Sequence, residues 1–220
     1  LSVLGLVFAL LTLSGCVLAT VRTLDEDEEA KVGFEPEVYV EEIWESRVLP
    51  AYDQEAVDLT MLLSAIEADE DAAIAEYGNR SGTGAYSFMV RGEGTIITLD
   101  TSSRAGLLVV DLAPADGTAD LNIAVGPLIK ISQRGSVRDA VGFIEYGNFV
   151  NQQEFAGVAN AMGERITAMV ADALGADSAE AIGDLDPAAF KGKSVTFVGA
   201  FSLDTRDDII IVPVDLEVSD

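Results

Sequence analysis

The residue whose type and position most clearly predict a chemistry is Cys16, the single cysteine of the 220-residue sequence. It closes the segment Leu13-Ser14-Gly15-Cys16, which follows an uncharged apolar run from Leu1. Such a run, ending in small residues, is typical of an export leader that a peptidase removes. The freed cysteine then accepts a diacylglyceryl group, and further fatty chains such as palmitate make the attachment stable. We therefore expect residues 1–15 to be a lipoprotein signal peptide and Cys16 to be lipidated.

A second interpretation of the same stretch stays open. Leu1–Thr20 is also long enough to cross a bilayer as an uncleaved helix. No basic segment and no initiator Met precede it, so we expect that the sequence begins inside the leader. Val17 is not an acidic retention residue, which leaves both the inner and the outer membrane open. In either case we expect the bilayer as a partner, on the periplasmic face of a bacterial membrane.

The composition excludes several classes of chemistry. There is no histidine, and one cysteine cannot form an intramolecular disulfide, so Cys–His zinc sites and imidazole triads are excluded. Thirteen basic against 38 acidic residues give a net charge of −25, which repels phosphate backbones. We expect no metal, no cofactor, no catalytic residue, no enzymatic activity and no nucleic-acid partner. A carboxylate-dependent hydrolase stays an alternative, because so many acids always place some pair at a usable distance.

The run from Asp25 to Glu29 is acidic at every position. We interpret residues 16–35 as a lipidated, solvated tether that holds the following domain off the membrane. Calcium binding is the alternative, but a loop of the EF-hand type starting at Asp25 lacks the glycine that its sixth position requires.

Two further segments combine aromatic faces with directed polar groups, as sugar sites do. One is Asp100–Arg104 and the other is Phe143–Gln152. Structural roles explain the same residues and are the preferred interpretation: Asn151 as a helix cap, Phe149 packed against that helix, and Arg104 paired with an acid. The candidate contacts with a ligand or partner are Arg104, Arg138, Tyr146, Asn148, Asn151 and Gln152.

The hydrophobic pattern divides residues 36–220 into a helical part, 36–79, and a strand-rich part, 84–220, of one α+β domain. In the helical part we expect a helix from Pro36 to a stop at Pro50 with Trp44 in the core, a second from Asp58 to Ala68, and a third from Asp69 to its C′ residue Gly78.

From Gly84 the apolar period changes from 3.6 to 2, and glycines at 92 and 94 predict a sharply bent first strand. We expect strands over 84–99, 107–112, 121–125, 194–203 and 209–218, with a turn at 114–117 and a hairpin at 204–207. Between the third and fourth strands we expect an edge segment over 127–134, a short helix capped by Ser136 with Asp139 at the capping-box position, and a long helix from Asn151 to Gly175.

Three strands, a helical connection and two strands make the order of an OB-type barrel. We therefore expect a five-stranded OB-like barrel with the N-terminal helices packed on it.

Several short motifs, taken together, give the chain a family resemblance. They are Leu13-Ser14-Gly15-Cys16, Ile43-Trp44-Glu45-Ser46, Gly92-Glu93-Gly94-Thr95, Asp100-Thr101-Ser102-Ser103-Arg104-Ala105-Gly106, Gly126-Pro127, Arg138-Asp139-Ala140 and Phe149-Val150-Asn151-Gln152-Gln153-Glu154-Phe155. This combination resembles domain of unknown function 2291, a family of predicted periplasmic lipoproteins. The resemblance implies a lipoprotein often encoded beside sugar-type ABC transporters, with no agreed activity.

These observations predict a non-enzymatic, membrane-anchored accessory of an ABC-type sugar uptake system, in contact with the permease, the solute-binding protein or the sugar. The alternative is a lipoprotein that itself binds a small ligand such as a sugar or nucleoside.

Overall fold

The computed structural model describes residues 33–129, 131–205 and 209–220. The chain divides into Leu1–Phe34 and a second unit, Glu35–Asp220, which contains every element described below. The predicted leader, the lipid attachment at Cys16 and the acidic run 25–29 lie outside the described residues.

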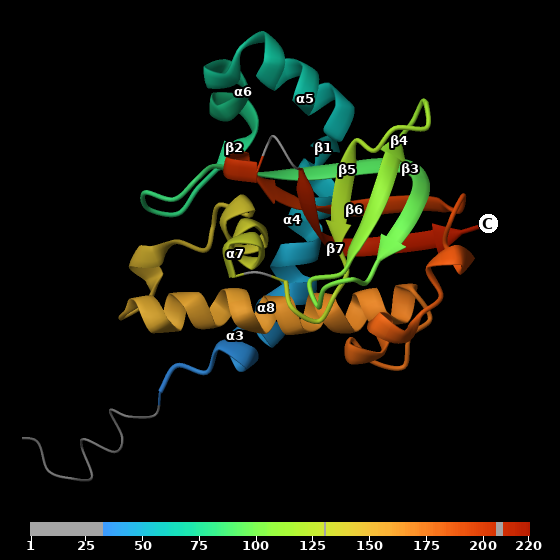
Figure 1. Ribbon diagram of the computed structural model, residues 1–220. Coiled ribbons are helices and arrows are strands. Elements are labelled where there is room, and N and C mark those ends of the chain that lie inside the picture. Colours follow the sequence, from blue (N-terminus) through green and yellow to red (C-terminus); the bar gives the residue numbers. More distant parts are fainter. Residues whose placement is uncertain (1–32, 130, 206–208) are drawn as a thin grey trace, which may run out of the picture. The chain divides into compact units, whose positions relative to one another are not determined.

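Within the described residues, seven strands form one sheet. The main strands are β3 (Ser87–Asp100), β4 (Leu107–Leu112), β5 (Leu121–Ala124), β6 (Ser194–Ser202) and β7 (Ile210–Ser219). Their pairings run β3–β4–β5–β7–β6 and return from β6 to β3, with β5–β7 parallel and the others antiparallel. The predicted strand order, with helices between the third and fourth main strands, is therefore correct (Figure 1).

Strand β3 is long and bends in its middle, and each half pairs with a different neighbour. Residues 87–95 pair with β6, and residues 94–100 pair with β4. At the change of partner stands Gly94, where an added Cβ would lie 2.5 Å from the Asp111 carbonyl oxygen. Gly92 is equally restricted, since a Cβ there would lie 2.7 Å from the Phe197 ring. The prediction that these glycines mark one bent strand is confirmed.

Two strands of two residues each were not predicted: β1 (Val57–Asp58) and β2 (Gly78–Asn79), which pair with the first half of β3. Gly78 directly follows the helix Glu70–Tyr77, as predicted, but its φ of −90° is not left-handed. Its lack of a side chain serves close packing instead, because a Cβ would lie 2.8 Å from the Ile74 carbonyl oxygen.

The N-terminal helices are α3 (Pro36–Ile43), α4 (Leu49–Glu55), α5 (Leu59–Ala68) and α6 (Glu70–Tyr77). The expected stop at Pro50 is wrong. A π-helical turn over Trp44–Val48 joins α3 to α4, and the Leu49 N–H donates to the Trp44 carbonyl. The shifted hydrogen bonds before Pro50 let the helix continue, and Pro50 occupies the first turn of α4, where a missing N–H costs nothing. Trp44 is buried, as predicted.

The connection between β5 and β6 holds α7 (Ile131–Ala140) and α8 (Gln152–Ala173). The expected edge segment over 127–134 is wrong, because α7 begins at Ile131, and Ser136 is a buried residue inside α7 rather than its cap. In contrast, α8 begins after Asn151 and ends before Gly175, whose φ is +71°, as predicted. Short 3₁₀ turns cover Tyr146–Asn148, Glu180–Asp184, Pro187–Ala189 and Leu203–Thr205.

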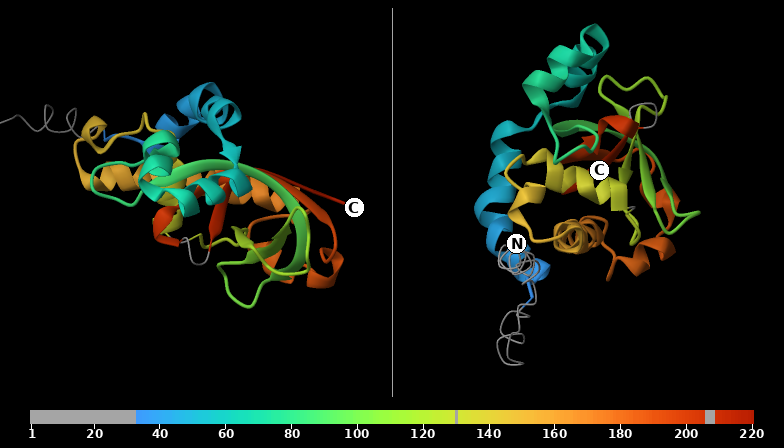
Figure 2. Two further views of the ribbon diagram at one scale, coloured as in Figure 1. Left: turned by 90° about the horizontal axis from the view of Figure 1, so that it is seen from above. Right: turned by 90° about the vertical axis from the view of Figure 1, so that its left-hand side faces the viewer.

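Figures 1 and 2 show α7 between the sheet and α8, with α3 against the outer side of α8 and with α5 and α6 at the opposite end of this unit. The core lies where α7 and α8 meet β3, β6 and β7. Phe88 of β3 and Phe201 of β6, both fully buried, stack there with ring centroids 5.4 Å apart. This packing brings the start of β3, the end of β6, α7 and the first turns of α8 together, and the candidate site lies among them.

Candidate ligand site at Arg138

A cavity of about 320 Å³ opens where α7, α8, β3 and β6 meet. Its described lining contains donors, acceptors and an aromatic face. These residues are Gly84, Ala85, Ser87, Gly135, Ser136, Arg138, Asp139, Gln152, Phe155, Ala156, Ala159, Ser202 and Asp204. Two of the predicted candidates, Arg138 and Gln152, are therefore brought to one cavity.

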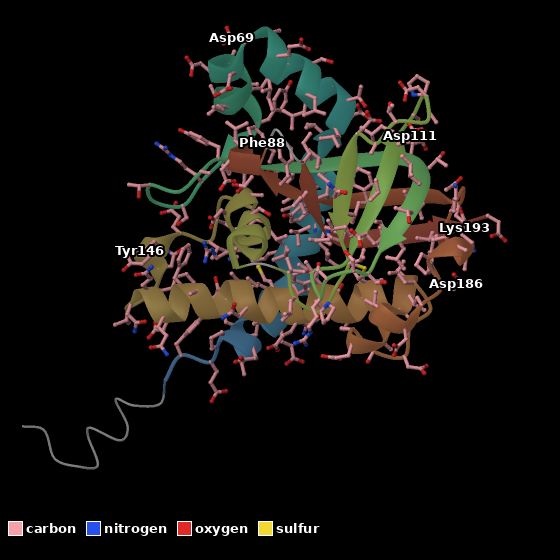
Figure 3. All side chains as sticks on the ribbon, viewed as in Figure 1. Asp69, Phe88, Asp111, Tyr146, Asp186 and Lys193 are labelled. Carbon is pink, nitrogen blue, oxygen red and sulfur yellow. The ribbon has the colours of Figure 1, made fainter. Side chains whose placement is uncertain are left out.

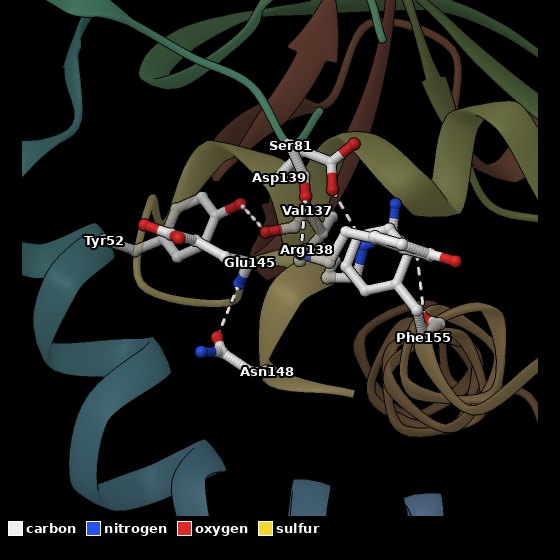
Figure 4. A network of polar contacts seen from close by, with 9 residues as sticks. Tyr52, Ser81, Val137, Arg138, Asp139, Glu145, Asn148 and Phe155 are labelled. Carbon is white, nitrogen blue, oxygen red and sulfur yellow. Dashed lines mark hydrogen bonds and ion pairs between the residues drawn. The ribbon is translucent and has the colours of Figure 1, made fainter. Parts of the chain in front are cut away.

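Arg138 is the most constrained side chain of this cavity. It is 9% exposed, and its Nε donates to Asp139 Oδ1 at 2.7 Å. Its Nη1 donates to the Phe155 carbonyl at 3.0 Å, and its guanidinium carbon lies 3.4 Å from the Phe155 ring centre. Among the described residues Nη2 has no hydrogen-bond acceptor. The guanidinium is therefore fixed in one orientation (Figure 4), and its Nη2 N–H groups could donate to a ligand in the cavity.

The helix that carries Arg138 is held in place by Tyr52 of α4. The Tyr52 hydroxyl donates to the Val137 carbonyl at 3.1 Å, as Figure 4 shows. Burial raises the pKa of Tyr52 well above its ordinary value, and the nearby charge of Asp139 raises this pKa further. Tyr52 is therefore a neutral donor at any physiological pH, and it positions α7 without contributing charge to the cavity.

The segment 143–152 forms the rim beside this cavity, and its polar groups mostly bind their own backbone. Asn148 Oδ1 accepts from the Glu145 N–H at 2.9 Å, and the Tyr146 N–H donates to Ser81 Oγ at 2.9 Å. Asn151 Oδ1 accepts from the Glu154 N–H at 2.9 Å. The structural interpretation of Asn151 as the cap of α8 is thus confirmed.

Aromatic rings continue this rim. Tyr146 meets Phe155 edge-on at 5.6 Å between centroids, and Phe149 packs on Phe155 at 5.6 Å, so Phe149 does brace the start of α8. Figure 3 shows Tyr146 at the N-terminal end of α8. Tyr146 thus shares the Phe155 ring with Arg138, although Tyr146 does not line the cavity itself.

Arg104 stands apart from the other candidates. It lines a second cavity, of about 200 Å³, with Thr101, Ser102, Ser103, Gly106, Gly126, Pro127, Glu180, Ile182 and Gly183. No acid pairs with Arg104 among the residues that the structure describes. Local bonds hold its loop: Asp100 Oδ1 accepts from the Ser102 N–H at 2.9 Å, and Ser103 Oγ accepts from the Ala105 N–H at 3.3 Å.

Sequence reasoning missed Asp139 and Phe155 as partners of Arg138, and it missed Ser87 and Asp204 as lining residues of the same cavity. Local patterns assigned them other roles: a capping-box acid, a core aromatic, a strand residue and a hairpin acid. The one available signal was that Asp139 follows Arg138 directly in the sequence, which places a carboxylate close to a cation, and a buried cation needs such a partner.

Across the described ranges 33–129, 131–205 and 209–220, no group of three or more metal-ligating side chains gathers. Over the same ranges, no helix has the length and apolar character needed to cross a membrane.

The family model of the predicted periplasmic lipoproteins DUF2291 matches residues 6–217. The chain belongs to this family. The family resemblance proposed from the motifs is therefore confirmed, and so is its description as a predicted periplasmic lipoprotein. No match was found among curated proteins.

Among solved structures, this DUF2291 chain is similar to an OB-fold protein from Thermotoga maritima. The TM-score is 0.61 at 15% sequence identity, and the match covers 85% of this chain and 99% of that chain. At this identity the likeness concerns the fold alone. It agrees with the α+β prediction and with the predicted relation to OB folds, while the sheet contains seven strands among the described residues rather than the five expected.

Proposed function

We propose that this lipoprotein binds a small, uncharged, hydroxyl-rich ligand of the sugar class in the Arg138 cavity, without transforming it. The observation that carries the proposal is the fixed guanidinium of Arg138. An ion pair, a backbone carbonyl and a ring hold it in one orientation. Nη2 donates to no acceptor among the described residues, and Gln152 lines the same cavity.

The charges around the cavity favour a neutral ligand over an anion. Arg138 is already paired with Asp139, and Asp204 adds a second carboxylate to the lining. A phosphate or carboxylate ligand would meet a cation that is already neutralised by Asp139 and a further carboxylate, that of Asp204. A sugar instead offers hydroxyls that accept from Arg138 and Gln152 and donate to Asp204 and the serines, while its apolar face can lie against an aromatic ring.

We propose that the five main strands form an OB-type barrel, which carries the Arg138 cavity. The closed circuit of pairings from β3 through β4, β5, β7 and β6 back to β3 supports it. The chain is anchored by lipid at Cys16 on the periplasmic face of the membrane, in keeping with the family description.

The proposal is tested by titration calorimetry with neutral pentoses and hexoses, nucleosides, and the matching sugar phosphates. We expect a neutral sugar to bind and its phosphate to bind more weakly. Gln152→Ala should weaken binding about tenfold, the effect of one lost hydrogen bond to a polar ligand. The neighbouring exposed Gln153→Ala is the matched control. Absence of binding for every compound, or equal loss in both variants, would contradict the proposal.

We further propose that the bound sugar links the protein to an ABC-type uptake system as a non-enzymatic accessory. Support comes from the family resemblance and from the sugar-compatible cavity. Affinity purification of the lipidated chain from solubilised membranes should recover a permease or solute-binding protein. Recovery of no transport component would contradict this role, and a change in the mass of the added sugar would contradict the non-enzymatic assignment.

A further inference from the structure

Three large apolar side chains of the described residues are exposed on α3 and just before α8. Val150 is 90% exposed, Tyr146 48% and Val38 46%. Val150 and Tyr146 belong to the rim before α8, and Val38 belongs to α3. We name this surface the valine–tyrosine patch, which comprises Val38, Tyr39, Tyr146, Phe149 and Val150.

Ring contacts join the two elements of the patch. Tyr39 of α3 meets Phe149 edge-on at 5.7 Å between centroids. Phe149 packs on Phe155, and Phe155 in turn contacts Tyr146. The rings of Tyr39, Phe149 and Tyr146 are therefore joined, the last through the buried Phe155, and the exposed Val38 and Val150 are the chain neighbours of Tyr39 and Phe149. Exposed apolar side chains that gather in this way mark a site of contact.

The position of the patch along the chain indicates what covers it. Helix α3 opens at Pro36, directly after residues 16–35, which connect it to Cys16. Val38 and Tyr39 thus lie in the first turn of the helix that directly follows residues 16–35. At about 3.3–3.6 Å per residue, this connection spans at most about 70 Å, so the first turn of α3 cannot lie farther than that from a lipidated Cys16 and the bilayer that holds it.

We infer that the valine–tyrosine patch rests on the surface of that bilayer. The inference depends on lipidation of Cys16, which is part of the proposed function. Tyrosine beside aliphatic residues suits the boundary between headgroups and acyl chains, because its ring is apolar and its hydroxyl is polar. The patch is small, yet tethering raises its effective concentration at the surface, so weak affinity is enough to populate the docked state.

Acidic residues at the patch restrict the kind of lipid. Glu145 precedes Tyr146, and Glu154 Oε2 accepts from the Val150 N–H at 3.0 Å. These carboxylates repel anionic headgroups. Docking should therefore be stronger on zwitterionic than on anionic bilayers at low salt, and added salt should reduce the difference because it screens the repulsion.

The experiment uses the full lipidated chain in phosphatidylcholine vesicles with brominated acyl chains, which quench nearby tryptophan. Trp44, the single tryptophan, is replaced by Phe, and Val150→Trp supplies the probe. Met61→Trp in the same background is the control, because Met61 is 42% exposed and lies on α5, away from α3 and α8 (Figures 1 and 2). We expect severalfold stronger quenching and a blue shift for Val150→Trp, and reduced quenching when Val38→Ser is added.

The possible failures are distinguishable. A chain that does not float with the vesicles lacks the anchor, which overturns both the anchoring and this inference. A chain that floats with equal quenching at both positions overturns the docking alone. A Val150→Trp emission that shifts with protein concentration and not with brominated lipid assigns the patch to a second copy and also overturns it.

If the tryptophan variants do not fold, hydrogen exchange of the unmodified lipidated chain gives the same decision. Amides of residues 146–151 should exchange severalfold more slowly on zwitterionic than on anionic vesicles at low salt. Equal rates on both surfaces would overturn the inference.

Discussion

The guanidinium of Arg91, in the middle of β3, donates a 2.7 Å hydrogen bond to the backbone carbonyl of Asp53, near the end of α4. It also donates to the carbonyls of Ala56 at 3.0 Å and Tyr52 at 3.4 Å. The Tyr52 carbonyl already accepts from the Ala56 N–H, while Asp53 and the C-cap Ala56 present carbonyls at the end of α4, where helical partners run out. One cation therefore binds the C-terminal end of α4. The contact fixes the helix that carries Tyr52, which in turn holds α7.

Arg91→Ala should therefore lower the free energy of unfolding by about 2 kcal/mol, because charge-assisted hydrogen bonds to two half-buried carbonyls and one exposed carbonyl are lost. Arg91→Lys should retain part of the stability, since a lysine cannot reach several carbonyls in one plane. Urea unfolding followed by circular dichroism measures both. The exposed Lys191→Ala, expected to change stability by less than about 0.5 kcal/mol, is the control. A loss no larger for Arg91→Ala than for this control contradicts the assignment.

The cap of α8 gives a second prediction. Asn151→Ala removes the acceptor of the Glu154 N–H and should cost about 1 kcal/mol of unfolding free energy. Asn151→Asp keeps an acceptor and should retain the stability. Asn160, exposed in the interior of the same helix, is the matched control, where Asn160→Ala should be neutral or slightly stabilising. Thermal unfolding would decide, and equal losses at 151 and 160 would show that the cap adds nothing.

The two ends of α8 could be predicted from sequence because their signals are local. Asn151 with Glu154 three residues later starts a helix, and Gly175 takes the left-handed conformation that ends one. The start of α7 could not be predicted in this way. Its first turns are polar and contain Gly135, a poor helix former, so the helix depends on packing against β3, β6 and α8.

The residues of the candidate site also divide into those that local sequence signals could predict and those that depend on tertiary packing. Arg138 and Gln152 could be proposed from residue type, but no local pattern shows that Ser87 and Asp204 line the same cavity. Ser87 is the first residue of β3, and Asp204 lies in the turn that follows β6, whose antiparallel pairing with β3 brings Ser87 opposite Ser202. Arg104, chosen on equal grounds, lies in another cavity because the loop between β3 and β4 packs on residues 126–127 instead.

That loop depends on a close backbone contact at Gly126. A Cβ there would lie 2.4 Å from the Ala105 carbonyl carbon and 2.5 Å from the Arg104 oxygen. Gly126→Ala should therefore cost about 2 kcal/mol or more, because backbone rather than a flexible side chain must move. Gly183 lines the same cavity with open space around its Cβ position, so Gly183→Ala should leave the stability nearly unchanged. Chemical denaturation of the pair tests the contact, and similar midpoints would contradict it.

The buried ion pair of the candidate site can be tested by a double-mutant cycle. Asp139→Ala leaves the cation of Arg138 buried without its carboxylate, and we expect a loss of about 3 kcal/mol. Adding Arg138→Met should recover much of this loss, because the unpaired charge is removed and an apolar side chain fills its place. The cycle is measured by urea unfolding at neutral pH. Strictly additive losses would show that the two side chains act independently.

The loop that carries Arg104 also has a titratable residue whose environment can be measured directly. Hydrogen bonds from the Ser102 side chain and then from its backbone N–H hold the pKa of Asp100 below its ordinary value. Since the folded pKa is below the unfolded one, the stabilising contribution is present above the unfolded pKa, near pH 4. It is lost as the pH falls through the folded pKa. Ser102→Ala should therefore raise the pKa of Asp100 toward its ordinary value.

Carbon-detected NMR titration of the carboxyl groups measures this shift without perturbing the protein. Asp116 serves as the internal control, because hydrogen bonds from Thr118 lower its pKa and the Ser102 substitution leaves them intact. We expect the Asp100 titration to move to higher pH while that of Asp116 stays in place. If both remain unchanged, the Ser102 hydroxyl does not stabilise the Asp100 carboxylate, and another contact must order the loop beside Arg104.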